Sequence, residues 1–311
     1  MYKRQTNKLT RAVVSEMTDY HEEQIHYAQY GVNLPAVTDV VVTSVEPLRI
    51  LYCGRIEKDQ KRCQDLVKIA QGLTDGGVNY QLLIAGDGPY KDQLLSELGS
   101  EKVVYLGSIP AEQVSEKAYR QADVLLLTSE WETGPIVIWE ALAHGLAVVT
   151  SKYSGVKTEG ALIDQINCLM FEVGDAPGAV TAITSLLDGS KRRKLFDAGV
   201  ALIRDRYSRE LSVKQWHMVF NEIASYEPRS HARDSKPVKF YSGGRLESLF
   251  GYRLAERIRR LLDKPVMMNS AGDEWPHAHS HVQPEFGAQF ADRILEVESV
   301  NVESREAQVE D

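Results

Sequence analysis

Apolar positions recur along this chain with two different spacings. Five short apolar runs predict buried strands at 48–52, 81–85, 103–106, 123–127 and 146–149. Between and after them, apolar residues recur at every third or fourth position, which predicts amphipathic helices. These helical segments are 61–72, 90–98, 111–121, 136–144, 176–187, 192–206 and 210–223. Strands that alternate with helices in this way indicate the α/β class, with a doubly wound, Rossmann-like parallel sheet.

The pattern is different before the first of these strands. Residues 13–15 have a strand-like pattern and 17–29 a helical one, and Gly31 and Pro35 then interrupt both. The opening residues 1–5 do not resemble a natural protein start, so we expect that an upstream part of the gene is missing. An ordinary solvated basic terminus is the alternative.

The pattern changes again after the last helical segment. Residues 228–239 are polar and typical of a linker, 246–262 have apolar residues at helical spacing, and 296–311 are acidic. We therefore expect the sheet domain to be followed by an extension that is partly helical and partly disordered. The three expected parts are a partial N-terminal segment at 1–44, the sheet domain at 45–227 and the C-terminal extension at 228–311.

Composition and charge narrow the class of protein. With 43% hydrophobic and 26% charged residues, the chain has the balance of a globular protein. Its net charge of −8 argues against nucleic acid as the main partner, because binding a phosphate backbone needs a basic surface. Three cysteines are too few for a disulfide framework. No apolar run reaches the roughly 18 residues of a membrane span. We expect a cytoplasmic protein, and peripheral contact with the inner face of a membrane stays open.

The strongest signal for a functional site lies in residues 129–145, where seven residues separate Glu132 from Glu140. Pro135 between them favours a helix start, because proline fits best at the first helical position. We therefore expect Glu132 in the loop after the fourth strand and Glu140 facing out of the second helical turn. Solvated surface glutamates are the alternative explanation for such a pair.

The same helix start predicts an anion site. The first N–H groups of a helix have no acceptor within it, and the helix dipole favours negative charge there. We expect these donors at Gly134, Ile136 and Val137, whereas Pro135 has no N–H and slightly weakens the site. Carboxylates that accept from hydroxyl groups, next to N–H groups that donate to phosphate, suit a sugar diphosphate.

This segment resembles the E-x7-E signature of the retaining GT-B glycosyltransferases. The residues from Gly54-Arg55-Ile56 to Lys61-Arg62, after the first strand, resemble that family's G-R-[LI]…K-[GR] segment, in which the Arg and Lys bind the donor diphosphate. The chemistry agrees, because a guanidinium offers a planar fork to phosphate oxygens and an ammonium a point charge. Taken alone, Arg55 and Lys61 are typical surface cations.

Two further segments match the family in the same order along the chain. Gly86 and Gly88, in a Gly-Asp-Gly-Pro turn after the second strand, resemble the family's G-x-G-P turn. Ser108 and Ile109, after the third strand, resemble the loop whose backbone reads the nucleotide base. Each segment is also typical of a plain connection between a strand and a helix.

The resemblance implies that residues 45–227 are the nucleotide-sugar-binding C-terminal half of a GT-B fold, and that 1–44 are a remnant of the acceptor-binding half. It implies transfer of a sugar from a nucleoside-diphosphate sugar to a hydroxyl group with retention of configuration. The acceptor is a glycan, a lipid or a small molecule. As a fragment, the chain is expected to transfer poorly or not at all.

The resemblance also implies a role for each matched residue. Arg55 and Lys61 stabilise the leaving diphosphate, which itself helps to take the acceptor proton during front-face attack. Glu132 positions the sugar and Glu140 the ribose. No cofactor or metal ion is expected, because the cations replace a metal. The remaining donor-binding candidates are Gly54, Gly86, Gly88, Ser108, Ile109, Gly134, Pro135, Ile136 and Val137.

Three alternatives remain beside this interpretation. The chain could be a non-catalytic nucleotide-sugar-binding subunit that works with a separate acceptor-binding chain. A dinucleotide-dependent oxidoreductase is disfavoured, because residues 53–58 lack the G-x-G-x-x-G pattern expected after the first strand. His277, His279 and His281 would share one face of a strand and could bind a metal, although a polar loop is simpler. His144, at a helix end, is expected to cap the helix rather than to act in catalysis.

Overall fold

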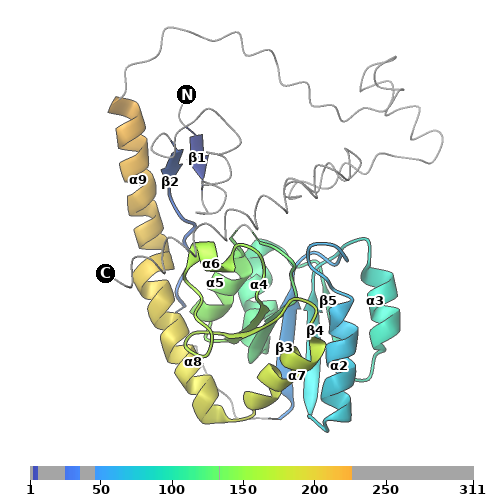
Figure 1. The fold of residues 1–311 in the computed structure, drawn as a ribbon. Helices are drawn as coiled ribbons and strands as arrows, with labels where there is room; N and C mark the ends of the chain where they lie inside the picture. The colour runs from blue at the N-terminus through green and yellow to red at the C-terminus, as the bar shows by residue number, and fades with distance from the viewer. Residues whose placement is uncertain (1–2, 6–24, 36–45, 133, 226–311) are drawn as a thin grey trace, which may run out of the picture. The chain divides into compact units, whose positions relative to one another are not determined.

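The central element of the protein is a six-stranded parallel sheet (Figure 1). The computed structural model describes residues 3–5, 25–35, 46–132 and 134–225. The strand order is β5-β4-β3-β6-β7-β8, and all neighbouring strands are parallel. The strands are β3 (Leu48–Cys53), β4 (Tyr80–Ala85), β5 (Val103–Gly107), β6 (Val124–Leu127), β7 (Ala147–Ser151) and β8 (Leu169–Phe171). The predicted α/β class with a doubly wound parallel sheet is confirmed.

Helices cover both faces of this sheet. Figure 1 shows α2 and α3 on one side of the strands, and α4 and α5 on the other. Helix α7 packs against α2, and α8 packs against α5. The helices are α2 (Asp65–Asp75), α3 (Lys91–Leu98), α4 (Ala111–Lys117), η3 (Tyr119–Gln121), α5 (Ile136–Ala143), α6 (Val156–Glu159), α7 (Ala176–Ser185), α8 (Gly189–Leu202), η4 (Ile203–Tyr207) and α9 (Arg209–Ser225).

The core consists of two apolar layers, one on each face of the sheet. Along β3, Ile50 and Tyr52 belong to the layer under α2 and α7, whereas Leu51 belongs to the layer under α5. Successive side chains of a strand point to opposite faces, so a strand that is covered on both sides is apolar throughout. This explains why continuous apolar runs, rather than alternating ones, predict these strands.

Strand β8 is absent from the predicted runs. It contains only Leu169, Met170 and Phe171 and lies at the end of the sheet. Its pairing with Val149 and the following residues of β7 makes it a strand. Three residues carry too little periodic signal for the sequence to indicate this.

Helix α2 begins at Asp65, not at Lys61 as the spacing predicts. The carboxylate of Glu57 accepts the backbone N–H groups of Asp59 and Lys61, and Arg62 has a positive φ of 48°. These local contacts hold the preceding residues in a non-helical turn. Lys61 therefore belongs to the loop between β3 and α2.

Two predicted helices each contain two segments of different type. The predicted helix 111–121 is α4 followed by the short 3-10 helix η3, and the predicted helix 192–206 is α8 followed by the π-helical turn η4. Apolar spacing does not distinguish these backbone types, because all of them place every third to fifth residue on one side.

The predicted helix over 17–29 is wrong at residues 25–29. β2 (Ile25–Tyr27) is a strand that pairs in parallel with β1 (Lys3–Gln5), and Ile25 is 1% exposed. Strand pairing and burial outweigh the helical spacing here, since tertiary context overrides local propensity. The remainder of that predicted helix and the strand-like residues 13–15 lie outside the described residues.

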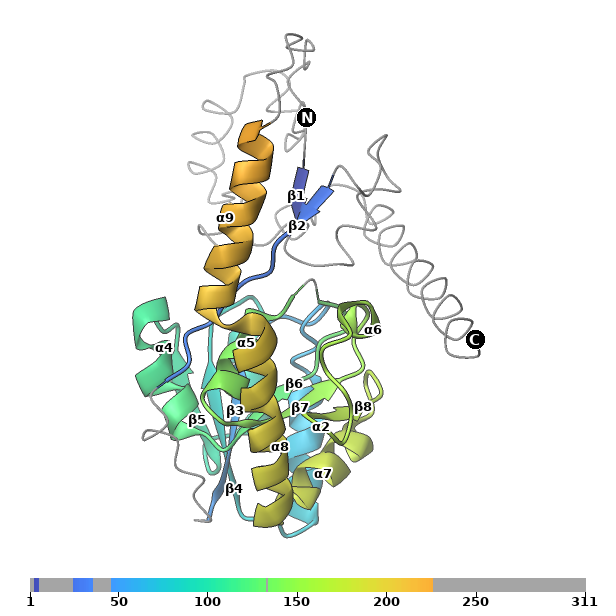
Figure 2. The same ribbon diagram turned by 90° about the vertical axis from the view of Figure 1, so that its left-hand side faces the viewer.

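The segment after β2 runs along the start of α9. The N–H of Arg209 donates to the carbonyl oxygen of Val32 at 3.0 Å, and the Ser212 hydroxyl donates to the carbonyl oxygen of Gln29 at 2.8 Å. Figure 2 shows α9 beside β2.

In the part of the chain that the structure describes, no helix combines the length and the apolar character needed to cross a bilayer.

The predicted C-terminal features lie outside the described residues. These are the linker at 228–239, the helix at 246–262, the acidic stretch at 296–311 and the three histidines His277, His279 and His281. The domain boundaries at 44/45 and 227/228 therefore stay predictions.

Candidate functional site

The chain changes direction across the sheet between β3 and β6. From β3 it proceeds outward through β4 to β5, and it then returns to β6, beside β3, and proceeds through β7 to β8. In an open parallel sheet, ligands bind beyond the carboxyl ends of the strands where the order reverses in this way. The candidate site therefore lies between the loop after β3 (54–64) and the loop after β6 (128–135).

An ion pair joins two of the predicted catalytic residues across these loops. Lys61 Nζ lies 2.7 Å from Glu132 Oε1, and the Ser129 hydroxyl donates to the same oxygen at 2.6 Å. The Glu132 side chain is 3% exposed and that of Lys61 15%. Glu132 lies in the loop after β6, as predicted. Because it is buried and paired, it is not an ordinary solvated glutamate.

The third predicted catalytic residue is connected to the same pair of loops. Arg55 Nη2 donates to Gln60 Oε1 at 2.8 Å, and Gln60 Nε2 donates to the carbonyl oxygen of Trp131 at 3.0 Å. Arg55 is half-buried and Gln60 is 1% exposed. The structure thus brings Arg55, Lys61 and Glu132 into one hydrogen-bonded region at the point where the strand order reverses.

A second ion pair joins the two loops nearer to solvent. Arg62 Nη1 lies 3.0 Å from Glu130 Oε2, and Arg62 Nε lies 2.8 Å from Asp65 Oδ2 at the start of α2. Glu130 is about half exposed, so solvent screens this contact and it contributes little stability by itself. This contact holds the loop after β3 beside the loop after β6.

Gly86 and Gly88 allow the loop after β4 to lie directly against the loop after β3. A Cβ atom on Gly86, where φ is 138°, would lie 1.8 Å from the carbonyl oxygen of Gly54. A Cβ atom on Gly88 would lie 2.3 Å from that of Ile56. Only glycine tolerates such a close approach, and it fixes the backbone on both sides of Arg55. Direct contact of these glycines with a donor stays a prediction.

Helix α5 begins at Ile136, where the spacing predicts it, and Pro135 is its N-cap residue rather than its first helical residue. Its ψ of 95° is not helical, and it follows Gly134, which has a φ of 119°. The carbonyl oxygen of Pro135 accepts the N–H of Ile138 at 3.0 Å. The N–H groups of Ile136 and Val137 precede the first intrahelical bonds and are suitable donors for an anion.

Glu140 is partly buried in the second turn of α5 and faces η3. The Tyr119 hydroxyl, on a residue that is 1% exposed, donates to Glu140 Oε2 at 2.6 Å.

Burial raises the pKa of Cys53, at the end of β3, to about 11, and the Glu140 carboxylate adds to the rise. A hydrogen bond with Tyr119 and the charge of Lys61 lower that pKa. Tyr119 therefore contacts both Glu140 and the last residue of β3.

His144 has the structural role predicted for it. Its Nδ1 lies 2.7 Å from the carbonyl oxygen of Glu140, its Nε2 lies 2.7 Å from the Ser115 hydroxyl, and its ring stacks on Tyr119. Burial lowers the pKa of the imidazole, which favours the neutral ring. Gly145 follows with a φ of 78°, as expected of a glycine that ends a helix.

Ser108 and Ile109 are at the carboxyl end of β5, which is two strands from β3 and three strands from β6 in the sheet order. Ser108 is exposed, and Ile109 is partly buried against the layer under α5. Among the described residues, no recorded contact joins either of them to Arg55, Lys61 or Glu132. Their role in base recognition stays a prediction.

Sequence reasoning missed three residues that contact the predicted site: Gln60, Ser129 and Tyr119. Gln60 and Ser129 lie next to or near Lys61 and Glu132 in the chain, so their polar side chains were a weak available signal. Tyr119 is far from Glu140 in sequence, and only the packing of η3 on α5 brings its hydroxyl to that carboxylate.

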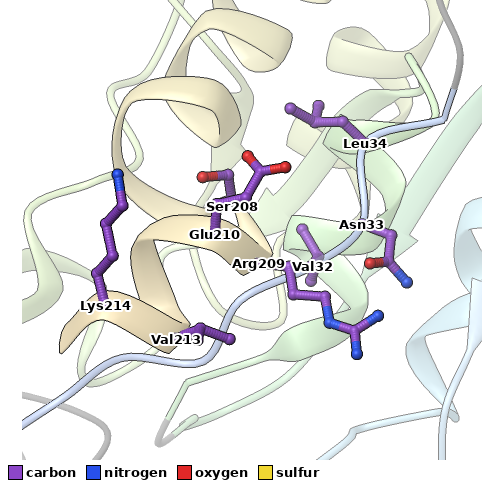
Figure 3. Close-up of a pocket in the computed structure, with 8 residues that line it drawn as sticks. All are labelled: Val32, Asn33, Leu34, Ser208, Arg209, Glu210, Val213 and Lys214. Carbon is purple, nitrogen blue, oxygen red and sulfur yellow. The ribbon is translucent and has the colours of Figure 1, made fainter. Parts of the chain in front are cut away.

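A separate cavity of about 560 Å³ lies where the segment after β2 meets the start of α9 (Figure 3). None of the predicted donor-site residues lines it. The cavity is lined by Val32, Asn33, Leu34, Ser208, Arg209, Glu210, Val213 and Lys214.

Within the described ranges, no group of three or more His, Cys, Asp or Glu side chains is arranged to hold a metal ion.

The central part of the chain matches a known protein family. Residues 47–189 match the family model described as Glycosyl transferases group 1. The chain is 25% identical over 164 residues to the Sulfoquinovosyl transferase SQD2 of Arabidopsis thaliana, covering 51% of this chain and 30% of that protein. It is 36% identical over 129 residues to the Lipopolysaccharide 1,6-galactosyltransferase of Salmonella typhimurium, covering 38% of this chain and 35% of that protein.

The fold also matches solved structures. The structure of Anabaena HepE in complex with UDP and glucose has a TM-score of 0.59 and 15% sequence identity, with 72% of this chain and 63% of that chain covered. The chain therefore spans less than two thirds of the length of each of these three proteins. Residues 47–189 are thus similar to the Glycosyl transferases group 1 family, and the sheet that they form is the Rossmann-like α/β fold found in GT-B glycosyltransferases.

Proposed function

We propose that this chain binds a nucleoside-diphosphate sugar between the loops after β3 and β6, and that it provides the donor site of a retaining glycosyltransferase. The observation that carries the proposal is the convergence of Arg55, Lys61 and Glu132 where the strand order reverses. Two cations beside one buried carboxylate match the two parts of such a donor, an anionic diphosphate and a sugar with hydroxyl groups.

The cations act on the charge of the leaving diphosphate. As the bond to the sugar breaks, negative charge grows on the diphosphate oxygens, and groups already held in place stabilise it with little reorganisation. Arg55, Lys61 and the N–H groups at the start of α5 provide these contacts. They neutralise the diphosphate without a requirement for a divalent cation.

The carboxylates act on the hydroxyl groups of the donor. Both contacts of the Glu132 carboxylate, with Lys61 and with Ser129, fall on Oε1. Its Oε2 is therefore the oxygen that we assign to the sugar. Glu140, held by Tyr119 near the end of β3, accepts from the ribose. Retention follows from front-face attack, in which the diphosphate itself helps to take the proton of the acceptor.

The comparisons support this class of reaction. HepE is described in complex with UDP and glucose, and the two curated relatives are named as a sulfoquinovosyl and a galactosyl transferase. Homologues that are transferases favour an enzyme over a non-catalytic binding subunit. The acceptor, a cytoplasmic location and peripheral contact with a membrane stay predictions.

Calorimetry tests the donor site. We expect UDP, GDP or ADP to bind the 311-residue chain, and Arg55→Ala to weaken the binding by about 1.5–3 kcal/mol, the usual loss of a charge-assisted hydrogen bond. Arg193→Ala is a matched control, because Arg193 is 59% exposed on α8, where it pairs with Asp197 and lies over the ring of Phe196. If none of the three nucleotides binds, or if Arg55→Ala binds as tightly as the wild type and the Arg193→Ala control do, the proposed site is wrong.

A further inference from the structure

Gln60 is a neutral residue buried between the two loops of the proposed donor site. Its side chain is 1% exposed, and it stands immediately before Lys61 in the loop after β3. A buried amide is costly unless its polar atoms form hydrogen bonds. Both ends of this amide do so, each with a different loop.

The hydrogen bonds determine the orientation of the amide. Gln60 Oε1 accepts from Arg55 Nη2 at 2.8 Å, and Gln60 Nε2 donates to the carbonyl oxygen of Trp131 at 3.0 Å. A guanidinium only donates and a carbonyl only accepts, so the reversed amide would lose both bonds. The backbone carbonyl of Gln60 also accepts the N–H of Glu130 at 2.7 Å. Gln60 therefore joins the arginine to the loop that carries Glu132.

The neutrality of Gln60 distinguishes Arg55 from Lys61. Lys61 is paired with the carboxylate of Glu132. Within the described residues, no ion pair is recorded for Arg55, and its recorded side-chain partner is the Gln60 amide. An amide acceptor fixes the guanidinium without cancelling its charge, and it uses only one of several N–H donors. The full charge of Arg55 thus remains for a ligand.

We propose that Gln60 is a positioning residue, which holds the Arg55 guanidinium toward the diphosphate of the donor and keeps its charge uncompensated. This inference rests on the proposed function. Arginine has many rotamers in solution, and fixing one of them before the ligand arrives lowers the entropy lost on binding. Gln60 acts on the ligand only through Arg55.

Two substitutions separate holding the guanidinium from preserving its charge. Gln60→Ala removes the acceptor, and we expect the affinity for the nucleoside diphosphate to fall about 10-fold, the effect of one lost hydrogen bond. Gln60→Glu keeps the size and the acceptor, but it pairs with Arg55 and removes the donor to Trp131. We expect an equal or larger loss. Gln71→Ala is the matched control, because Gln71 is an exposed glutamine on α2.

The experiment is calorimetry on the full 311-residue chain. The probe is whichever of UDP, GDP and ADP binds the wild type, together with the corresponding nucleoside. We expect both Gln60 variants to weaken binding of the diphosphate and to leave binding of the nucleoside unchanged, because only the diphosphate contacts Arg55. Urea unfolding of each variant checks that the fold persists, and Gln60→Glu provides the test if Gln60→Ala does not fold.

A double-mutant cycle with Arg55→Ala decides whether Gln60 acts through the arginine. If it does, Gln60→Ala has no further effect on diphosphate affinity in the Arg55→Ala background. An undiminished effect there, or an equal loss for the nucleoside, overturns the proposal. So does wild-type affinity in both Gln60 variants while Arg55→Ala is weakened. Absence of nucleotide binding by the wild type would instead refute the proposed function itself.

Discussion

The ion pair between Lys61 and Glu132 should make the loss of Lys61 more costly alone than together with the loss of the Glu132 carboxylate. We consider three variants: Lys61→Met, Glu132→Gln and the double substitution. Lys61→Met leaves a carboxylate that is 3% exposed, with the Ser129 hydroxyl as its remaining recorded donor. Glu132→Gln leaves an ammonium that is 15% exposed and can still donate to the amide oxygen. The double variant contains no buried charge at this position.

The burial of the two groups determines the magnitudes. Removing one partner of a buried pair costs about 3–5 kcal/mol, and the remaining hydrogen bond of Ser129 places Lys61→Met near 3 kcal/mol. Glu132→Gln should cost about 1.5 kcal/mol, because the lysine keeps a neutral acceptor and some contact with water. The double variant leaves no unpaired buried charge, so its cost is only that of the lost hydrogen bonds, about 1.5 kcal/mol. The coupling between the two sites is then about 3 kcal/mol.

Urea unfolding, followed by tryptophan fluorescence and circular dichroism, measures these free energies. At about 2–4 °C per kcal/mol, the melting temperature of Lys61→Met should fall by about 6–12 °C. The exposed pair Lys152 and Glu172, with side chains that are 43% and 68% exposed, provides the control, and we expect a coupling below about 0.5 kcal/mol there. If the effects of Lys61→Met and Glu132→Gln add to within about 0.5 kcal/mol, the pair is not coupled and the reasoning is refuted.

Two further predictions concern the backbone and the pH dependence. In urea unfolding, Gly86→Ala should lower the free energy of unfolding by about 2 kcal/mol or more, because its Cβ would lie 1.8 Å from the carbonyl oxygen of Gly54. Gly77→Ala is the control: with a φ of 67° and no atom within 4 Å of the new Cβ, it should cost only about 1 kcal/mol. Burial raises the pKa of Cys53 to about 11 from an ordinary 9.0, so the unfolded chain loses the thiol proton at a lower pH than the folded chain does. The free energy of unfolding should therefore fall as the pH rises from 9 to 11. A Cys53→Ser variant that loses stability just as steeply over that range would contradict the second prediction.

Local patterns in the sequence were sufficient for the central architecture. The apolar runs at 48–52 and 123–127 predict β3 and β6 to within one residue, because strands covered on both faces must be apolar along their length. The Arg55 and Lys61 segment and the Glu132 segment each follow such a strand. Since loops after parallel strands meet at one edge of the sheet, sequence order alone indicated that these segments face the same ligand.

The sequence was insufficient where a contact joins residues that are far apart in the chain. β8 is a strand because it pairs with β7, and the residues at 25–27 are a strand because they pair with β1, although their own spacing favours a helix. The sequence places Glu140 on the second turn of a helix, but only the packing of η3 on α5 brings the Tyr119 hydroxyl against its carboxylate.

The sequence by itself thus determined the class of fold, the order of the strands along the chain and the residue types at the candidate site. Tertiary structure alone decided how those residues are paired: Lys61 with Glu132, and Arg55 with Gln60. The physical reason is that periodicity reports which side of an element is buried, whereas an ion pair or a buried hydrogen bond depends on which loops meet across the sheet. The strand order β5-β4-β3-β6-β7-β8, which places β3 beside β6, brings these loops together.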